Sequence, residues 1–327
     1  MNNRIFFVDS KHGNHLVASR AIKKFALDSI RSLIISEDIM VVVRSDLIGL
    51  TIKMVDKFIN KKAQKDILVG FLGSKPCIVA INTNLLDKFF PDIHLFYNNI
   101  RQEWPCLDLG HNELKLLDNA ADINAFNQEV QNTLRQNAID MEVYLQDPST
   151  TYLSYDTKFG RGVIIEPNVY FGENVKIHDN VHIRAFSYLE GVEIESGVEI
   201  GPFVRIRGNS KIGTNVKIGN FVEIKNTEIA SGTKASHLSY IGDSKIGKNV
   251  NIGAGVITCN YDGFKKHITI IKDDSFIGSN SSLIAPITIG SRSLFGAGSF
   301  INKDVPDDAF SEGRAKQIMK PNKNMRK

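Results

Sequence analysis

The chain has 327 residues, 42% of them hydrophobic, with a formal net charge of +4. This length suits two domains, and no stretch approaches the roughly 20 apolar residues of a membrane span. The N-terminus MNNRIFFVDSKHGNH lacks a secretory pattern, and Cys77, Cys106 and Cys259 lack CxxC spacing. We therefore expect a cytoplasmic protein with reduced thiols. Because no basic stripe with interleaved aromatics occurs, we expect no nucleic-acid partner.

The N-terminal third, residues 1–117, has the pattern of a mixed α/β domain. Apolar strands are expected at Ile39–Val43, near Ile67–Phe71 and at Cys77–Ile81, with an amphipathic stretch at Thr51–Ile59. The next segment, residues 118–147, has helical spacing without Gly or Pro up to about residue 140. It predicts a connecting helix and linker, which ends at a proline at position 148.

From Ile165 to Ile301 an aliphatic residue or Phe recurs every sixth position, with slips to five residues as at Leu189 to Ile194, and the repeat domain is expected over residues 148–306. One unbroken run is Ile200, Ile206, Ile212, Ile218 and Ile224. A helical period of 3.6 does not produce this spacing, whereas short strands joined by tight Gly and Asn turns do. The pattern predicts a hexapeptide parallel β-helix, in which each hexad forms one side of a coil. The fold class is therefore mainly β.

One insertion interrupts the repeat. The insertion Thr258–His267 interrupts the hexad count, and inserted loops commonly lie on the functional face. Val305-Pro306 is expected to close the array. The basic tail, residues 307–327, either is a solvated end or brings one cation to an anionic cofactor.

Polar residues that depart from the repeat are the candidates for chemistry. His237 lies in KASHLSY, where the hexad register is lost; it is either structural or a general base, since a free imidazole has a pKa of about 6.5. Arg207 and Lys225 are 18 residues apart, one coil of three hexads, so they should stack about 5 Å apart. They form either a solvated pair with carboxylates such as Glu223 or a phosphate or carboxylate site.

A histidine-bound metal is not expected. His178 and His182 are four residues apart, which places them on different sides of a hexad, and His237 and His267 lie elsewhere. Lys265 and Lys266, in the insertion, offer further cations for an anion site.

The stretches GPFVRIR, GNFVEIK and KASHLSYIGDSKIGKNVNIGAGVITCNYDG, together with DDSFIGSNSSLIAP and FGAGSF, closely resemble the bifunctional GlmU family. The resemblance covers residues 118–316. It implies a left-handed β-helix that assembles as a homotrimer with active sites between subunits. It also implies acetyl transfer from acetyl-CoA to glucosamine-1-phosphate, on the route to UDP-N-acetylglucosamine.

By the same resemblance, His237 matches the family's general base. The positions that match its sugar-phosphate ligands are Arg207, Lys225, Tyr240, Asn251 and Lys266. The positions that match its acetyl-CoA contacts are Ala254, Asn260, Tyr261, Ser279, Ala297 and Arg314.

The N-terminal third departs from the family pattern. The family opens with a Gly-rich phosphate loop, but the first 40 residues here contain a single glycine, Gly13. Asp46 stands near the family's metal-binding Asp, and Ala120 replaces an Arg. The resemblance thus implies a reduced nucleotidyltransferase-like domain without uridylyltransferase activity, in a scaffold or docking role. Mg²⁺ is expected only if that half is active.

Three alternatives remain open. The chain could retain uridylyl transfer as a bifunctional enzyme, or the β-helix could serve only as an oligomerisation scaffold. A third alternative is acyl transfer to an amino acid or another sugar; against it, the paired cations favour an anionic acceptor.

Overall fold

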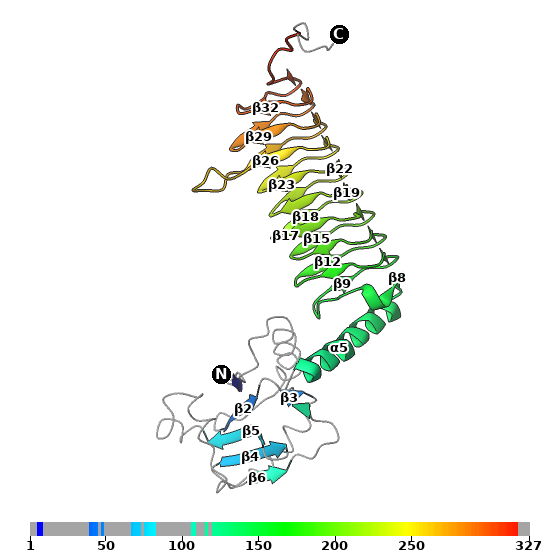
Figure 1. Ribbon diagram of the computed structural model, residues 1–327, viewed down its shortest axis with the longest axis vertical. Coiled ribbons are helices and arrows are strands. Elements are labelled where there is room, and N and C mark those ends of the chain that lie inside the picture. Colours follow the sequence, from blue (N-terminus) through cyan, green and yellow to red (C-terminus); the bar gives the residue numbers. More distant parts are fainter. Residues whose placement is uncertain are drawn as a thin grey trace, which may run out of the picture. The chain divides into compact units, whose positions relative to one another are not determined.

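The computed structural model describes residues 120–319 and, before them, only a set of short strands (Figure 1). The chain divides into two compact units, Met1–Val130 and Gln131–Lys327. The strands of the first unit are β1 (Ile5–Val8), β2 (Ile39–Arg44), β3 (Leu47–Ile48), β4 (Ile67–Leu72), β5 (Lys75–Asn82), β6 (Cys106–Asp108) and β7 (Lys115–Leu116).

The described part of the first unit contains a five-stranded sheet with the order β1-β2-β5-β4-β6 and a two-stranded antiparallel sheet, β3–β7. The pairs β1–β2 and β4–β6 are parallel, whereas β2–β5 and β4–β5 are antiparallel. Leu68 and Val69 of β4 are buried. The three strands expected from the sequence are confirmed, and the amphipathic stretch Thr51–Ile59, Gly13 and Asp46 lie outside the described residues.

Helix α5 (Ala120–Asp140) confirms the expected helix. Its second half packs against the start of the β-helix: Ala138 is buried in the common core, and the Gln131 amide bonds to both backbone groups of Leu153 at 2.8 and 2.9 Å. Asp147 then caps the short 3₁₀ helix Pro148–Thr150, accepting the Ser149 N–H at 3.0 Å. In the part of the chain that the structure describes, no helix is long and apolar enough to cross a membrane.

The remainder is a parallel β-helix with three sheets, which confirms the prediction (Figure 1). Sheet I contains β8 (Tyr144–Leu145), β10 (Ile164–Ile165), β13 (His182–Ile183), β16 (Glu199–Ile200), β19 (Lys217–Asn220), β22 (Lys234–His237), β25 (Asn251–Ile252), β28 (Phe276–Ile277), β31 (Leu294–Phe295) and β33 (Phe310–Ser311). Sheet II contains β11 (Tyr170–Phe171), β14 (Tyr188–Leu189), β17 (Arg205–Arg207), β20 (Glu223–Lys225), β23 (Tyr240–Gly242), β26 (Ile257–Cys259), β29 (Ser282–Ile284) and β32 (Phe300–Ile301). Sheet III contains β9 (Lys158–Phe159), β12 (Val175–Ile177), β15 (Val192–Ile194), β18 (Ser210–Ile212), β21 (Glu228–Ile229), β24 (Ser244–Ile246), β27 (Thr269–Ile271) and β30 (Ile287–Ile289).

Inward-facing aliphatic side chains stack from coil to coil and form the core. Ile200 pairs with Ile218, and Ile206 pairs with Ile224 one sheet further on; all four are almost completely buried. Between sheets the backbone turns at residues with positive φ, many of them Asn or Gly, because these residues reach the left-handed region at low cost. Each side of a coil thus contributes one buried aliphatic residue and one turn, and together they account for the six-residue period.

Two expectations about the repeat were wrong. The array does not close at Val305-Pro306, because β33 adds another strand by pairing with β31 in sheet I. Pro306 lies between strands, where it removes no ladder hydrogen bond. The stretch around His237 does not lose register either: β22 pairs with β19 from Lys234 to His237.

The insertion after Thr258 forms a loop that projects from the β-helix between β26 and β27 (Figure 1). Tyr261 and Lys266 form an antiparallel bridge across it. The Asp262 carboxylate accepts the N–H groups of Phe264 and Lys265, each at 2.7 Å, and contacts His267 at 2.7 Å. The Lys265 N–H, then the His267 contact and then the Phe264 N–H hold the pKa of Asp262 far below its usual range. Hydrogen bonds within the loop therefore stabilise its conformation.

Candidate active site

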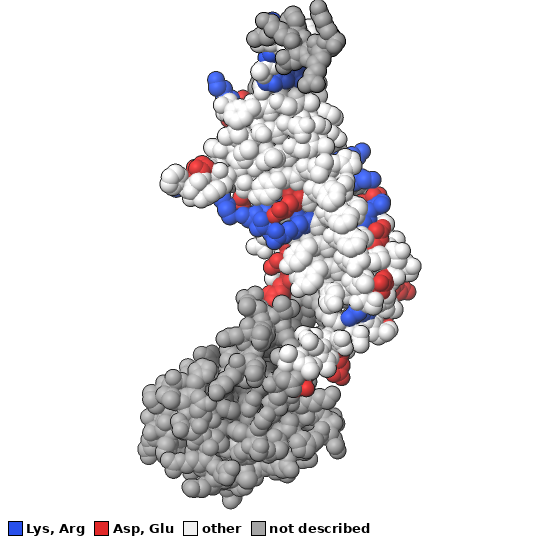
Figure 2. Space-filling model, in the orientation of Figure 1, with Lys and Arg blue, Asp and Glu red and all other residues white. Residues whose placement is uncertain are grey.

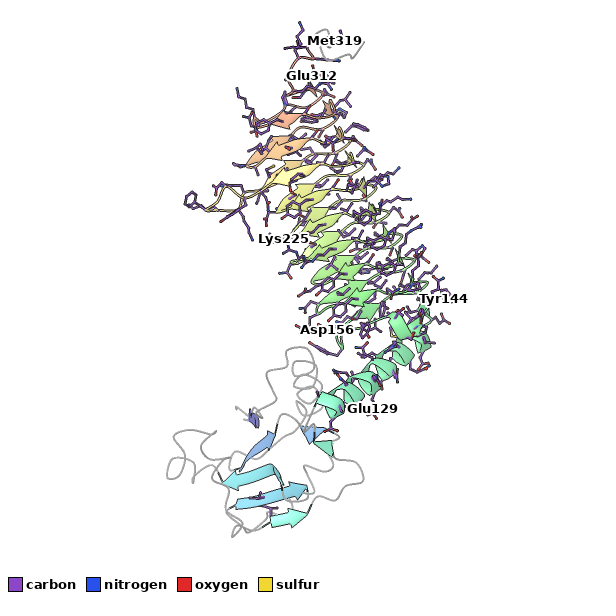
Figure 3. The ribbon with its side chains drawn as sticks, viewed as in Figure 1. Glu129, Tyr144, Asp156, Lys225, Glu312 and Met319 are labelled. Atoms are coloured by element: carbon purple, nitrogen blue, oxygen red, sulfur yellow. The ribbon has the colours of Figure 1, made fainter. Side chains whose placement is uncertain are left out.

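The predicted cation pair lies on sheet II. Arg207 of β17 and Lys225 of β20 are directly opposite each other, which confirms the 18-residue stacking (Figure 3 labels Lys225). The inserted loop brings Lys266 to the same place, where contact with its ammonium lowers the pKa of Lys225. Burial and Arg207 act in the same direction, and Asp243 opposes them. Figure 2 shows basic side chains gathered on this face beside the projecting loop.

Glu223 occupies part of this cationic cluster. Its Oε1 accepts two hydrogen bonds from Arg207, from Nε at 2.9 Å and from Nη2 at 2.8 Å. The alternative of a cation neutralised by a carboxylate thus holds for Arg207. Because both side chains are about one-third exposed, an incoming phosphate can replace Glu223 as the acceptor.

Behind the cations, a buried carboxylate connects two coils to the loop. Asp243 accepts a hydrogen bond from the Asn226 amide at 2.6 Å and a very short one from the Asn260 amide. Asp243 and Asn260 are each less than one-tenth exposed. The Asn260 backbone carbonyl in turn accepts the His267 N–H at 2.8 Å, so the network fixes the base of the loop that carries Lys266.

His237 ends β22, at the corner between sheets I and II. Its Nδ1 lies 2.6 Å from Oδ1 of Asn220, the residue opposite it on β19. The backbone carbonyl of His237 accepts the Ser239 hydroxyl at 2.9 Å, and the ring is exposed. The sequence analysis missed Asn220, although a count of 17 residues back from His237 finds it.

Four of the residues expected to contact acetyl-CoA lie along the corner that carries His237. They are Ala254, Ser279, Ala297 and Arg314. The register of sheet I carries His237 to Ala254 on the next coil, then to Ser279 and then to Ala297. Arg314 reaches this corner from the C-terminal tail, where its Nη1 donates to the Ala297 carbonyl at 3.1 Å. A ligand along this corner would therefore pass from His237 to Arg314.

The other predicted residues are placed differently. Tyr240 lies on sheet II, opposite Glu223. Asn251 lies on sheet I, opposite Lys234, and so not on the sheet that bears Arg207 and Lys225. Tyr261 belongs to the loop, is exposed, and donates its hydroxyl to the Gly263 carbonyl at 2.6 Å.

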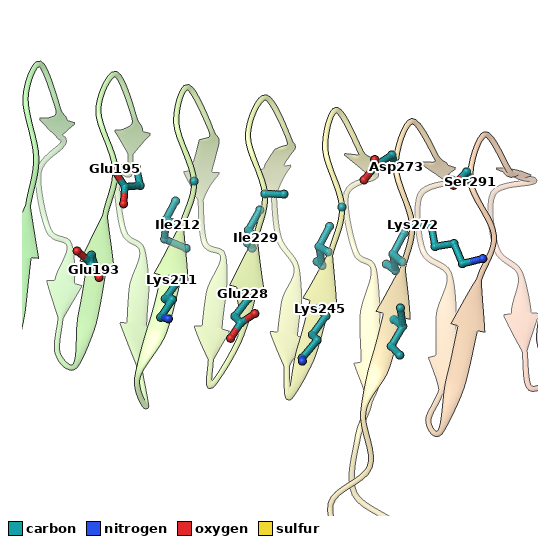
Figure 4. Close-up of a pocket in the computed structure, with 16 residues that line it drawn as sticks. Glu193, Glu195, Lys211, Ile212, Glu228, Ile229, Lys245, Lys272, Asp273 and Ser291 are labelled. Carbon is teal, nitrogen blue, oxygen red and sulfur yellow. The ribbon is translucent and has the colours of Figure 1, made fainter.

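Sheet III bears a separate set of charged side chains along a shallow groove (Figure 4). Lys211, Glu228 and Lys245 follow one another on neighbouring strands. Near one end, His178 contacts Glu193 at 3.0 Å and Glu195 at 3.8 Å. Lys176 and then His178 lower the pKa of Glu193 to about 2. None of the residues predicted for catalysis or binding lines this groove.

Comparisons with known proteins place the repeats in a family. Residues 156–191, 191–226 and 268–303 match the bacterial transferase hexapeptide model. The bifunctional protein GlmU of Agrobacterium fabrum is 42% identical over 241 residues, which are 73% of this chain and 53% of that protein. The chain is homologous to the GlmU proteins. GlmU of Bartonella bacilliformis is 52% identical over 178 residues, 54% of this chain and 40% of that protein.

This chain spans about half the length of these GlmU relatives. Among solved structures, LpxA from Acinetobacter baumannii matches 53% of this chain and 69% of its own at 19% identity and a TM-score of 0.31. That likeness carries no argument about function.

Removal of the Asp243 carboxylate should destabilise the β-helix. In Asp243→Ala the Asn226 amide and the buried Asn260 amide lose their acceptor, so we expect a loss of at least about 2 kcal/mol in chemical denaturation. Glu228→Ala, which removes an exposed carboxylate from sheet III, is the control and should change stability by less than about 1 kcal/mol. Equal losses would contradict a special role for Asp243.

Proposed function

We propose that this chain transfers the acetyl group of acetyl-CoA to the amine of glucosamine-1-phosphate, in a cytoplasmic setting. The observation that carries the proposal is the meeting of Arg207, Lys225 and the loop residue Lys266 on sheet II. Three neighbouring cations favour a dianionic phosphate, which relieves their mutual repulsion. The homology to GlmU proteins supports this acceptor over an amino acid.

His237 has the position and the chemistry of the base. With Nδ1 against Asn220, its Nε2 takes a proton from the sugar amine as that nitrogen attacks the thioester carbonyl. The carbon–sulfur bond then breaks, and the thiolate leaves with the electron pair and takes up a proton. A backbone N–H near Ala254 or Tyr261 is the proposed donor to the tetrahedral oxyanion.

Acetyl-CoA, a co-substrate, would lie along the corner from His237 past Ala254, Ser279 and Ala297. The Arg314 guanidinium stands at the far end of that corner, where it offers a charge to the phosphates of CoA. Asn260 and Tyr261 at the loop complete the proposed contacts. In this role the basic tail contributes one cation to the site.

The proposed assembly is a homotrimer with active sites between subunits. Sheet II is an open face, and a neighbouring copy would add a second wall and could supply Asn251. The corner before His237 carries stacked rings, with Phe203 4.9 Å from Phe186 and 5.2 Å from Phe221. These phenylalanines are 46–53% exposed, and contiguous apolar surface of this kind favours burial against another chain.

The N-terminal unit is proposed to lack uridylyltransferase activity and to act as a scaffold or docking domain. Support comes from its sequence, since the first 40 residues offer one glycine where a phosphate-binding loop requires several. If the half were active, its reaction would need Mg²⁺.

Two assays on the purified chain test this assignment. One follows CoA release from acetyl-CoA with glucosamine-1-phosphate, and the other follows pyrophosphate release from UTP, Mg²⁺ and N-acetylglucosamine-1-phosphate. We expect CoA without pyrophosphate. Both products would show a bifunctional enzyme, and neither product would leave the β-helix as an oligomerisation scaffold.

Replacement of His237 should remove most of the rate while leaving the fold intact. Because general-base catalysis contributes about 10²- to 10⁴-fold, His237→Ala should lower kcat by that factor in the CoA-release assay. His178→Ala, on sheet III, is the control and should keep its activity. A fully active His237→Ala variant would exclude this residue as the base.

Arg207→Ala should act mainly on acceptor binding. The loss of one charged contact to the phosphate is expected to raise KM for glucosamine-1-phosphate by about tenfold or more, with KM for acetyl-CoA unchanged. Arg205→Ala removes a guanidinium from the same strand that stacks over Tyr188 instead, 5.9 Å from the ring centroid. If both variants had the same KM for the sugar phosphate, the cation site would be misplaced.

A further inference from the structure

The corner at His237 differs from every other corner along sheet I. Its strands are two residues long except β19 and β22, which have four each and pair up to Asn220 and His237. Gly219 allows this close approach, because a Cβ there would collide with the Ser236 carbonyl oxygen. Along sheet I, strand pairing thus extends into the corner only between β19 and β22, where His237 lies.

The residues in equivalent positions of neighbouring coils are small or lack donors. The register places Ala185 and Pro202 before Asn220, and Ala254, Ser279 and Ala297 after His237. Coil stacking by itself therefore requires no amide at this position. The Asn220–His237 pair is a local departure from the repeat, and its 2.6 Å contact joins two side chains.

The contact selects one form of the imidazole. An amide oxygen accepts a hydrogen bond, so Nδ1 must carry the proton and donate to Oδ1 of Asn220. In the neutral ring Nε2 then has the free lone pair, as a general base requires. Without the acceptor, the ring can turn and can place its proton on Nε2, where it blocks base catalysis.

We propose that Asn220 is a positioning residue that holds His237 in the Nδ1–H tautomer and aims Nε2 at the acceptor amine. This inference rests on the acetyltransferase function proposed above. Asn220 acts through His237 and need not contact either substrate. The pair is built into one chain, so it exists before substrates or a neighbouring subunit bind.

Two substitutions of Asn220 separate orientation from simple structure. Asn220→Ala removes the acceptor, so kcat should fall roughly five- to tenfold, with KM for the sugar phosphate within about twofold of wild type. Asn220→Asp keeps an acceptor and adds a negative charge, which favours the imidazolium. In the pH profile of kcat/KM for Asn220→Asp, the acidic limb should therefore move to higher pH. At pH values above that limb, kcat should be largely restored.

Asn249→Gly is the matched control. It deletes a different asparagine side-chain contact between coils, from the Asn249 amide to the Asp274 carboxylate at 3.1 Å, and glycine accepts the positive φ of that position. This variant should keep the wild-type kcat and pH profile. Thermal unfolding of all variants checks that each is folded at the assay temperature.

A measurement independent of turnover keeps the inference testable if the chain releases no CoA. Long-range ¹H–¹⁵N spectra report the tautomer of each histidine, and His237→Gln identifies the signals among the eight histidines. We expect the Nδ1–H form of His237 in wild type and a mixture in Asn220→Ala. An unchanged tautomer, or an unchanged kcat and pH limb, would overturn the role of Asn220. A wild type without CoA release, but with the expected tautomer change, would overturn the proposed function alone.

Discussion

Parallel coil-to-coil register is the constraint on which the rest of this structure depends. In the regular coils a strand residue lies over its counterpart 17 or 18 positions earlier, so a linear spacing becomes a column on one face. Inward columns are aliphatic because each coil buries the next, and this leaves the outward columns open to other uses. The proposed site takes one column of cations on sheet II and one corner column that begins at His237.

Much of this arrangement could be predicted because it follows from the period. The buried rungs and the stacking of Arg207 on Lys225 needed only counting. The end of the array was misplaced because Val305-Pro306 suggests a terminator, whereas proline is tolerated between strands. Asn220 escapes prediction for a related reason: KASHLSY departs from the hexad pattern, which conceals the pairing of His237 with Asn220 one coil back.

The conformation of the inserted loop could not be predicted from the repeat. Its residues interrupt the period, so the sequence offered both Lys265 and Lys266 as cations, and only the resemblance favoured Lys266. In the structure its place depends on Asp262, which binds the turn, and on Asp243, which binds Asn260 at its base. Both carboxylates accept hydrogen bonds whose geometry is set by the folded backbone. The spacing of these residues in the sequence does not predict them.

The projecting loop can vary in sequence more freely than the coils of the β-helix. Ile257 pairs with Ser282 across 25 residues, yet the strands on either side keep the ordinary ladder. Beyond the buried Asn260, the segment leaves and rejoins the coil at adjacent points, where the His267 N–H bonds to the Asn260 carbonyl, so the residues of its exposed tip do not pack in the core. Substitutions at the tip of this loop could therefore change the proposed contact of Lys266 with the acceptor, while the coils that carry Arg207 and Lys225 stay as they are.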